Sequence, residues 1–430
     1  MKKKFLTVVL VIGDIVLFYL SLFLALFIRY QKIPVSPSLN TFFLYSTPLF
    51  LIWLFFLWSL ELYSPKLQGG SFDFFRFLLI FVFLSIFSGT LYFYLQPDLP
   101  VAPKTILFLQ IGIFSLLFIL WRLLFDFLFR KKRKREKIII LGSPPELEDL
   151  LSSLKNSFFY QVIGVYNGQT DSQKIKEIIE KKKVKKIIVS NGLEFLRDIS
   201  FFSRLEIESF ANFYEEVTQK VPLSVLKNSR FLEEFYKKEE RSYLILKRAF
   251  DLFFSFIGIL ILAVLYPFIA LLIKIDSPGP VIFSQERIGK NRQKFRSYKF
   301  RSMFSSPEEK TKLWREKDKK EITTVGKFLR YTHLDELPQC VNIFKGDLSF
   351  VGPRPEWEKI ARIYEKEIPF YFLRYTVKPG LTGWAQLNFS PSRSVEEAKI
   401  KFQYDLYYIK HRSFLFDLSI FLKSLKKIFG

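Results

Sequence analysis

The stretch FDLFFSFIGILILAVLYPFIALLIKI, residues 250–275, decides the fold of the second half of this chain. It is long and apolar enough to cross a bilayer, which takes about 20 helical residues. Pro267 lies in its interior, where a proline removes a backbone hydrogen bond and kinks a helix. Because positively charged flanks stay in the cytosol, we expect a helix that enters, breaks at Pro267 and returns to the same face. A fifth span with a proline kink is the alternative. The basic flanks are Lys247 and Arg248 before the stretch, and Lys274, Arg287, Lys290, Arg292 and Lys294 at or after its end.

Four more apolar runs fill the first third of the chain, and each reaches spanning length. They are Phe5–Ile28, Phe42–Leu62, Phe74–Leu95 and Thr105–Phe129. The first is too long for a signal peptide, and no small-residue cleavage site follows it, so we interpret it as a retained helix. Lysines at positions 2–4 and the run KKRKREK (131–137) put both ends of this bundle in the cytosol. Asp14 lies inside the first run, either as a functional charge or as a polar contact between helices.

The composition fits a membrane protein of several domains. The chain has 430 residues, of which 50% are hydrophobic and 18% aromatic, and this length predicts two to four domains. The net charge of +24 indicates anionic partners, such as phosphate substrates or an acidic membrane surface. The basic residues follow the membrane edges rather than one soluble face, so nucleic acid is set aside as a partner. The single cysteine, Cys340, excludes a disulfide or a Cys-based metal site within one chain.

A soluble α/β domain is predicted after the fourth span. The segment KIIILGSPPELEDLLSSL (137–154) reads as a strand, a glycine turn and a helix, and KKVKKIIVSNG (182–192) repeats the strand and turn. Ser172–Lys183 has a helical pattern between them, and this alternation predicts a parallel sheet. A dinucleotide fingerprint would need G-x-G-x-x-G after the first strand, and only Gly142 is present. A structural or regulatory role is therefore favoured over nucleotide binding.

Four stretches after residue 276 carry chemistry-bearing residues. They are DSPGPVIFSQERIGK (276–290), YKFRSM (298–303), VGKFLRYTHLDELPQ (325–339) and GDLSFVGPRPE (346–356). Asp335 and Glu336 stand side by side in the third. Arg354 stands between two prolines in the fourth, which fix its backbone, and arginine suits bidentate phosphate contact. Residues 366–384 and 404–429 mix aromatic and basic residues, which is typical of interfacial amphipathic helices, with ordinary core helices as the alternative.

Taken together, these motifs resemble the bacterial sugar transferases, the monotopic polyprenol-phosphate phosphoglycosyl transferases, from about Tyr243 to the C-terminus. The residues that carry the resemblance are KRAFDLFFSFIGILILAVLYPF, IKIDSPGPVIFSQERIGK, YKFRSM, LDELPQ, GDLSFVGPRP and LTGWAQLN. The four spans and the α/β domain resemble the long form of this family. His333 stands where the family usually has a small polar residue.

The resemblance implies a reaction and its partners. A nucleotide sugar, with UDP as the expected nucleotide, would give its sugar-1-phosphate to polyprenol (undecaprenyl) phosphate and release a nucleoside monophosphate. Such a reaction would start an exopolysaccharide, capsule or O-antigen at the cytosolic face of the bacterial inner membrane. Membrane lipids are expected partners, while the sugar and the oligomeric state, a homodimer included, stay open.

The resemblance also implies residue roles. Asp335 would be the nucleophile, Glu336 its partner, and Mg²⁺ the cofactor that both hold. Two nearby carboxylates repel, and a hard divalent cation would remove that penalty. Arg354, Arg301, Lys299 and Arg330 are candidates for phosphate contact, with lipid headgroup binding or solvation as alternatives. Glu286 would organise a basic partner or the metal, and Asp405 would serve the site or cap a helix.

The sequence therefore predicts a membrane protein that combines α and α/β parts. Residues 1–130 would form four transmembrane helices, 131–236 a Rossmann-like α/β domain, and 237–430 a mainly helical catalytic domain with the re-entrant helix 250–275. One rival is a membrane nucleotide-sugar dehydratase or epimerase, since Tyr243 and Lys247 have the spacing of a Tyr-x-x-x-Lys pair, although no glycine fingerprint precedes them. A non-catalytic scaffold of polysaccharide assembly is the other.

Overall fold

The computed structural model describes most of the chain, in two compact units, Met1–Arg135 and Glu136–Gly430. The described residues are 2–31, 38–60, 62–63, 72–95, 103–130, 135–155, 157, 159–167, 172–190, 205–227, 232–235, 240–304, 322–389, 392 and 394–429. The lysines predicted to flank the first span begin α1, but the described side chains start after them, and most of the run 131–137 lies outside the described residues.

The first unit consists of the four predicted spans, which are confirmed as helices. They are α1 (Lys2–Tyr30), α2 (Ser38–Ser59), α3 (Phe72–Tyr94) and α4 (Pro103–Phe125), followed by one π-helical turn, Asp126–Arg130. Aromatic rings from the four helices fill the interior, among them the fully buried Phe18, Trp53, Phe81 and Phe114. Apolar side chains also cover the outside, and a helix that is hydrophobic all round is typical of a membrane span.

Asp14 is a polar contact between these helices. Its Oδ2 accepts hydrogen bonds from Tyr63 Oη at 2.6 Å and from Arg122 Nη2 at 2.8 Å. Both charged side chains are buried, and Arg122 stacks over the ring of Phe118. Because a charge within an apolar bundle needs a partner, this pair ties α1 to α4.

The second unit begins with the predicted parallel α/β sheet. Its strands are β1 (Glu136–Leu141), β2 (Tyr160–Tyr166), β3 (Lys186–Val189) and β4 (Glu206–Ser209), all parallel in the order β2-β1-β3-β4. The helices between them are α5 (Leu147–Lys155), α6 (Ser172–Lys182) and α7 (Phe210–Thr218).

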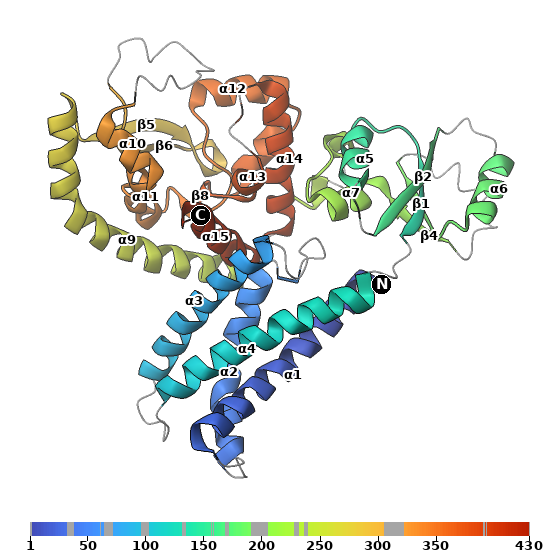
Figure 1. Cartoon of the computed structure of the whole chain (residues 1–430). Helices are drawn as coiled ribbons and strands as arrows, with labels where there is room; N and C mark the ends of the chain where they lie inside the picture. Colours follow the sequence, from blue (N-terminus) through green and yellow to red (C-terminus); the bar gives the residue numbers. More distant parts are fainter. Residues whose placement is uncertain are drawn as a thin grey trace. The chain divides into compact units, whose positions relative to one another are not determined.

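The strand β1 shows why the sheet is covered on both faces. Ile138 and Ile140 pack with α5 and α7, while Ile139 and Leu141 pack with α6. A strand with four consecutive apolar residues must bury both faces, so helices lie on each side of it, as Figure 1 shows. Gly142 follows β1 with a φ of 106°, and a Cβ there would lie 2.4 Å from Ser190 Oγ. Its role as a turn is confirmed, while any ligand of this domain stays a prediction.

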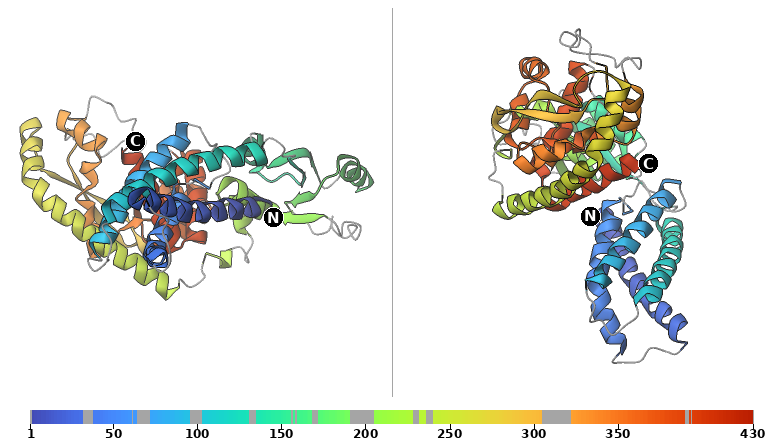
Figure 2. Two further views of the ribbon diagram at one scale, coloured as in Figure 1. Left: turned by 60° about the horizontal axis from the view of Figure 1, so that its bottom comes forward. Right: turned by 90° about the vertical axis from the view of Figure 1, so that its left-hand side faces the viewer.

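The run at 250–275 lies within one long helix, α9 (Arg241–Asp276), with Pro267 inside it. Figure 1 and the left view of Figure 2 show the helix bending, so that its two halves follow different sides of the same domain. A proline in a helix interior is a common cause of such a bend. The middle of the helix exposes large apolar side chains, among them Phe253, Phe256, Leu260, Val264 and Phe268.

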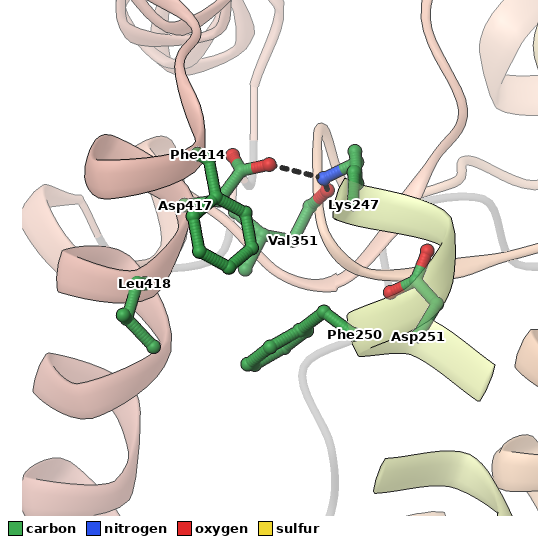
Figure 3. A pocket seen from close by; sticks show the side chains of 7 residues that line it. All are labelled: Lys247, Phe250, Asp251, Val351, Phe414, Asp417 and Leu418. Atoms are coloured by element: carbon green, nitrogen blue, oxygen red, sulfur yellow. Dashed lines mark hydrogen bonds and ion pairs between the residues drawn. The ribbon is translucent and has the colours of Figure 1, made fainter. Parts of the chain in front are cut away.

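Both ends of α9 are anchored in this domain. Near its start, Lys247 Nζ forms an ion pair with Asp417 at 2.6 Å and donates to Val351 O at 2.8 Å, around the small cavity drawn in Figure 3. Tyr243 Oη donates to the same Asp417, so the Tyr243–Lys247 spacing serves this anchor. Near its end, Ile269 and Ile273 join a buried cluster with Phe300 and Leu329.

The remaining elements form the body around the candidate site. An antiparallel hairpin joins β5 (Ile282–Ile288) to β6 (Lys294–Phe300) through the turn Lys290–Arg292. Then follow α10 (Thr324–Tyr331), the 3₁₀ turn Leu334–Glu336, α11 (Gln339–Lys345), β7 (Ser349–Val351), α12 (Glu358–Glu367), the 3₁₀ helix Tyr371–Thr376, β8 (Gly380–Thr382), α13 (Trp384–Asn388), α14 (Val395–His411) and α15 (Phe414–Phe429).

The two C-terminal helices belong to the domain core. Phe402 and Leu406 of α14 and Ile420 of α15 are buried in one cluster with Trp384. The segment after α7 joins the same cluster through Val221, Leu226 and Phe235 of the α/β region, including the 3₁₀ turn Leu223–Lys227. The segment 404–429 lies in these two helices, and α14 packs as a core helix, which was one of the two alternatives.

Candidate active site

The acidic pair lies on a short 3₁₀ turn between two helices. The helix α10 starts at an N-cap where Thr323 Oγ1 accepts from Gly326 N at 2.9 Å, and it ends before His333, whose φ is 57°. A left-handed residue ends an α-helix, and the turn Leu334–Glu336 follows at once. Successive residues in a 3₁₀ helix point about 120° apart, so Asp335 and Glu336 face different neighbours.

Glu336 is held by two cations. Its Oε1 accepts from Arg354 Nη2 at 3.0 Å and from Lys299 Nζ. Burial on its own raises the pKa of Glu336, but the charges of Arg354 and Lys299 outweigh burial and lower the pKa to about 2. Glu336 is therefore an anion that fixes two basic side chains beside Asp335.

Asp335 has the opposite surroundings. It is buried, and its carboxylate has no hydrogen-bond or ion-pair partner among the described residues. Burial raises the pKa of Asp335, the neighbouring charge of Glu336 raises it further, and Lys299, Arg330 and His333 oppose both. An unpartnered carboxylate of raised pKa next to cations is suited to attack an electrophile or to bind a cation.

Two other predicted residues lie close to the dyad. Lys299 comes from β6, and burial lowers its pKa in spite of the charge of Glu336. Arg330 comes from the last turn of α10, where its Nε donates to Ser302 Oγ at 2.8 Å and its charge acts on Asp335. The structure thus brings Lys299, Arg330 and Arg354 around one acidic pair.

Arg301 is placed elsewhere. Its guanidinium is buried and donates to main-chain carbonyls at the end of α9, namely Ser277 at 2.6 Å, Pro278 at 3.0 Å and Ile273 at 3.4 Å. Cations near the C-terminus of a helix satisfy its last carbonyls. Lys299 and Arg301, two residues apart, therefore have different roles: Lys299 contacts Glu336, and Arg301 holds the end of α9.

Glu286 and Asp405 are also away from the dyad. Glu286 is exposed on β5, opposite Arg296 in the ladder, because side chains alternate along a strand. Asp405 is buried in the middle of α14, which excludes a cap, and it forms an ion pair with Arg374 Nη2 at 2.9 Å.

Sequence reasoning missed the residues that surround Arg354. Arg287, next to Glu286, donates to Gln285 Oε1 at 2.6 Å and experiences the charges of Glu356, Arg354 and Glu336. Glu356 pairs with Lys401 at 2.6 Å; burial raises its pKa, but the charges of Lys401, Arg374 and Arg287 lower it to about 2. Because neighbouring side chains of β5 point to opposite faces, strand alternation could have indicated Arg287 rather than Glu286 as the residue near the site. The pairing of Glu356 with Lys401 could not be predicted, because it joins distant parts of the chain.

The residues at the dyad fit a divalent cation only together with a substrate. Among the described residues no group of three or more His, Cys, Asp or Glu side chains could hold a metal ion by itself. Asp335 and the second carboxylate oxygen of Glu336 are two hard oxygen donors. Mg²⁺ is usually bound by one or two carboxylates plus substrate phosphates, so this donor set suits it.

The fold and the site define a class: a domain with a long apolar helix that presents an acidic pair among basic side chains. A family model described as bacterial sugar transferase matches residues 242–430. An exopolysaccharide production protein PSS of Rhizobium leguminosarum bv. phaseoli is 41% identical over 183 residues, 41% of this chain and 92% of that protein. This chain therefore belongs to the bacterial sugar transferase family.

Two longer relatives are named for a reaction. A UDP-N-acetylgalactosamine-undecaprenyl-phosphate N-acetylgalactosaminephosphotransferase of Aeromonas hydrophila is 40% identical over 186 residues, 43% of this chain and 44% of that protein. A UDP-glucose:undecaprenyl-phosphate glucose-1-phosphate transferase of Xanthomonas campestris pv. campestris is 33% identical over 301 residues, 69% of this chain and 58% of that protein. The chain thus matches less than two thirds of the length of each.

Proposed function

We propose that this protein transfers a sugar-1-phosphate from a UDP-sugar to undecaprenyl phosphate at the cytosolic face of the bacterial inner membrane. The observation that carries the proposal is the unpartnered, buried carboxylate of Asp335, set beside cations that Glu336 holds in place. The names of relatives from Aeromonas and Xanthomonas support the reaction class. They differ in the sugar, so the sugar is left open.

The chemistry proceeds as two displacements at one phosphorus atom. A carboxylate oxygen of Asp335 attacks the phosphorus that bears the sugar, the bond to the bridging oxygen breaks, and UMP leaves with the electron pair. The phosphate oxygen of undecaprenyl phosphate then attacks the aspartyl phosphosugar, and the bond to Asp335 breaks. This step restores the carboxylate and forms undecaprenyl diphosphate-sugar, and covalent catalysis of this kind splits one difficult step into two easier ones.

The basic residues stabilise charge on the transferring group. Arg354 is about a third exposed at its side chain, with 38% accessible, so its guanidinium can meet a donor phosphate while Nη2 stays on Glu336. Lys299 and Arg330 lie close enough to Asp335 for their charges to act on its carboxylate. Positioning and electrostatic stabilisation account for most of the catalysis in phosphoryl transfer, which explains why cations surround one nucleophile.

Mg²⁺ is proposed as the cofactor, with Asp335 and Glu336 as its protein ligands beside the donor diphosphate. When bound, it neutralises phosphate charge and lowers the repulsion between the two carboxylates. The protein's own part is to hold Glu336 ionised through Arg354 and Lys299, as its lowered pKa indicates.

The path of α9 supports a site at one membrane face. Its first turns pair with Asp417 and its last turn is capped by Arg301, so both ends lie against the same domain. The apolar middle, with Pro267 at the bend, is the part left to enter lipid. We propose that it dips into the cytosolic leaflet and returns, which brings the dyad within reach of a soluble donor and a lipid acceptor.

The test follows UMP release and the protein adduct. Purified protein is incubated with single UDP-sugars, Mg²⁺ and undecaprenyl phosphate, and intact-protein mass is measured without the acceptor. One UDP-sugar should give UMP and a mass increase of one phosphosugar, and Asp335→Asn should give neither. Glu367→Gln, an exposed acid on α12, is the matched control. An Asp335→Asn variant that still forms the adduct at the normal rate would exclude Asp335 as the nucleophile.

A further inference from the structure

The main chain around Arg354 is held at each carbonyl of the segment 353–356. Gly380 N, Arg287 Nη1 and Ile288 N donate to the carbonyls of Pro353, Pro355 and Glu356 at 2.9, 3.4 and 3.2 Å. The carbonyl of Arg354 itself accepts from Nη2 of Arg374 at 2.9 Å. Two of these four hydrogen bonds have backbone donors, and a third comes from a side chain of β5. The hydrogen bond to the carbonyl of Arg354 depends on the buried side chain of Arg374.

Arg374 has no freedom to turn toward a substrate. Only 3% of its side chain is exposed, and the guanidinium lies 4.9 Å from the ring centroid of Tyr371. Nη1 donates to Tyr371 Oη at 2.5 Å, and Nη2 lies 2.9 Å from Asp405 Oδ2. Because the side chain is buried and both terminal nitrogens are engaged, Arg374 acts on the site through the carbonyl of Arg354 and not by contact with the donor.

Arg374 belongs to a cluster of ion pairs. Glu356 lies 3.8 Å from Arg374 Nη1 and pairs with Lys401 Nζ at 2.6 Å, so two cations face Glu356 and Asp405. Removing one member of this cluster would leave an enclosed charge without its partner, which is costly. Two members of the cluster lie on α14, one lies on the 3₁₀ helix Tyr371–Thr376, and Glu356 lies in the segment 353–356. The cluster therefore joins two core elements to the segment that carries Arg354.

We propose that Arg374 is a positioning residue for the transfer reaction. By fixing the Arg354 carbonyl, it aims the Arg354 guanidinium at Glu336 and at the donor phosphates. Asp405, in turn, fixes Arg374. This inference rests on the proposed function, in which Arg354 contacts phosphate, and it adds a residue that neither touches the donor nor lies near the dyad in sequence.

The test is a double-mutant cycle in steady-state UMP release, with the melting temperature of each variant measured alongside. Arg374→Gln should lower kcat/KM for the donor by about 10- to 100-fold, since small misplacements of a catalytic group cost rates of this order. Arg374→Lys should recover part of the loss. In an Arg354→Lys background, Arg374→Gln should lower kcat/KM further by less than about threefold. The reason is that the effects of two independent substitutions multiply, whereas two substitutions that act through the same residue do not. Arg362→Gln, an exposed arginine on α12, should change neither rate nor stability.

The contrary outcomes are distinct. A full further loss of kcat/KM in the Arg354→Lys background would overturn the inference and leave Arg374 as a purely structural residue. An unchanged kcat/KM in folded Arg374→Gln would overturn it too. If Arg374→Gln does not fold, Asp405→Asn or Arg374→Lys takes its place, and each is combined with Arg354→Lys. A loss of kcat/KM that is smaller in the Arg354→Lys background supports the inference, and an equal loss overturns it. Absence of UMP release from the unsubstituted protein, in contrast, would contradict the proposed function itself.

Discussion

Asp335 and Glu336 are neighbours in the chain, yet their surroundings move their pKa values in opposite directions. Arg354 and Lys299 hold Glu336 ionised against the effect of burial, whereas burial and the charge of Glu336 raise the pKa of Asp335. Two carboxylates in different environments can take different roles, one as an electrostatic anchor and the other as the reacting group. This difference between the two carboxylates arises from Lys299 on β6 and Arg354 after β7, and not from the sequence of the pair itself.

Substitution of Arg301 tests whether this residue stabilises the end of α9 or binds phosphate. Arg301→Gln should lower the free energy of unfolding by about 1–3 kcal/mol, because buried carbonyls at the end of α9 lose their donors. The donor KM of the folded fraction should not change. Thermal unfolding in detergent and UMP-release kinetics measure the two effects. A raised donor KM at an unchanged melting temperature would instead make Arg301 a phosphate ligand.

Glu356 predicts a pH dependence of stability. Its pKa in the folded protein is lowered from 4.5 to about 2, so its contribution is fully present above pH 4.5 and is lost as the pH falls toward 2. Glu356→Gln should therefore melt below the unsubstituted protein at neutral pH, and the gap should narrow as the pH falls through this window. A Glu356→Gln gap that is equally wide at low pH would contradict the assigned ion pairs.

At the residue scale, the sequence predicted the dyad and its nearest cations but not their support. Lys299, Arg330 and Arg354 lie in short motifs, so their convergence on Asp335 could be anticipated from the resemblance. Arg374 and Asp405 are far apart in the chain, and their pairing arises only when α14 packs against the 3₁₀ helix Tyr371–Thr376. The function of Arg301 depends on where α9 ends, which the motif YKFRSM does not reveal.

At the element scale, α9 and α11 pack closely enough to exclude a side chain. A Cβ on Gly258 would lie 2.4 Å from Cys340 Sγ. Gly258→Ala should therefore destabilise the folded domain by about 1–3 kcal/mol through overpacking, although alanine is the better helix former. Adding Cys340→Ala should restore part of this loss. Thermal unfolding of the two single variants and the double variant gives the coupling, and additive effects would contradict the contact.

Element patterns were predictable where the local signal was strong. The composition of the four long apolar runs predicts membrane-spanning helices, and the apolar residues of β1 predict a buried strand. The dyad lies on a 3₁₀ turn, because the left-handed His333 ends α10. The short strands β7 and β8 pair in parallel across a gap in sequence, and no local period in a three-residue strand indicates such a partner.

At the scale of the whole molecule, the site requires that both flanks of α9 lie on one side of the membrane. The helix is long enough to cross, with 36 residues, so length alone allows a span. The contacts of Lys247 and Arg301 hold its two ends to one domain, which supports the proposed return of the helix to the same face. The α/β region is joined to this domain by Glu215, which pairs with Lys410 at 2.8 Å.

Accessibility labelling of the two flanks of α9 tests the central claim most directly. In a Cys340→Ser background, single cysteines replace the exposed Glu240, before α9, and the exposed Glu367, after it. A membrane-impermeant maleimide is then applied to intact and to permeabilised spheroplasts. The account predicts that both positions are labelled only after permeabilisation. Labelling at position 367 but not at 240 in intact spheroplasts would show that α9 crosses the membrane, and the dyad would then never meet a cytosolic donor.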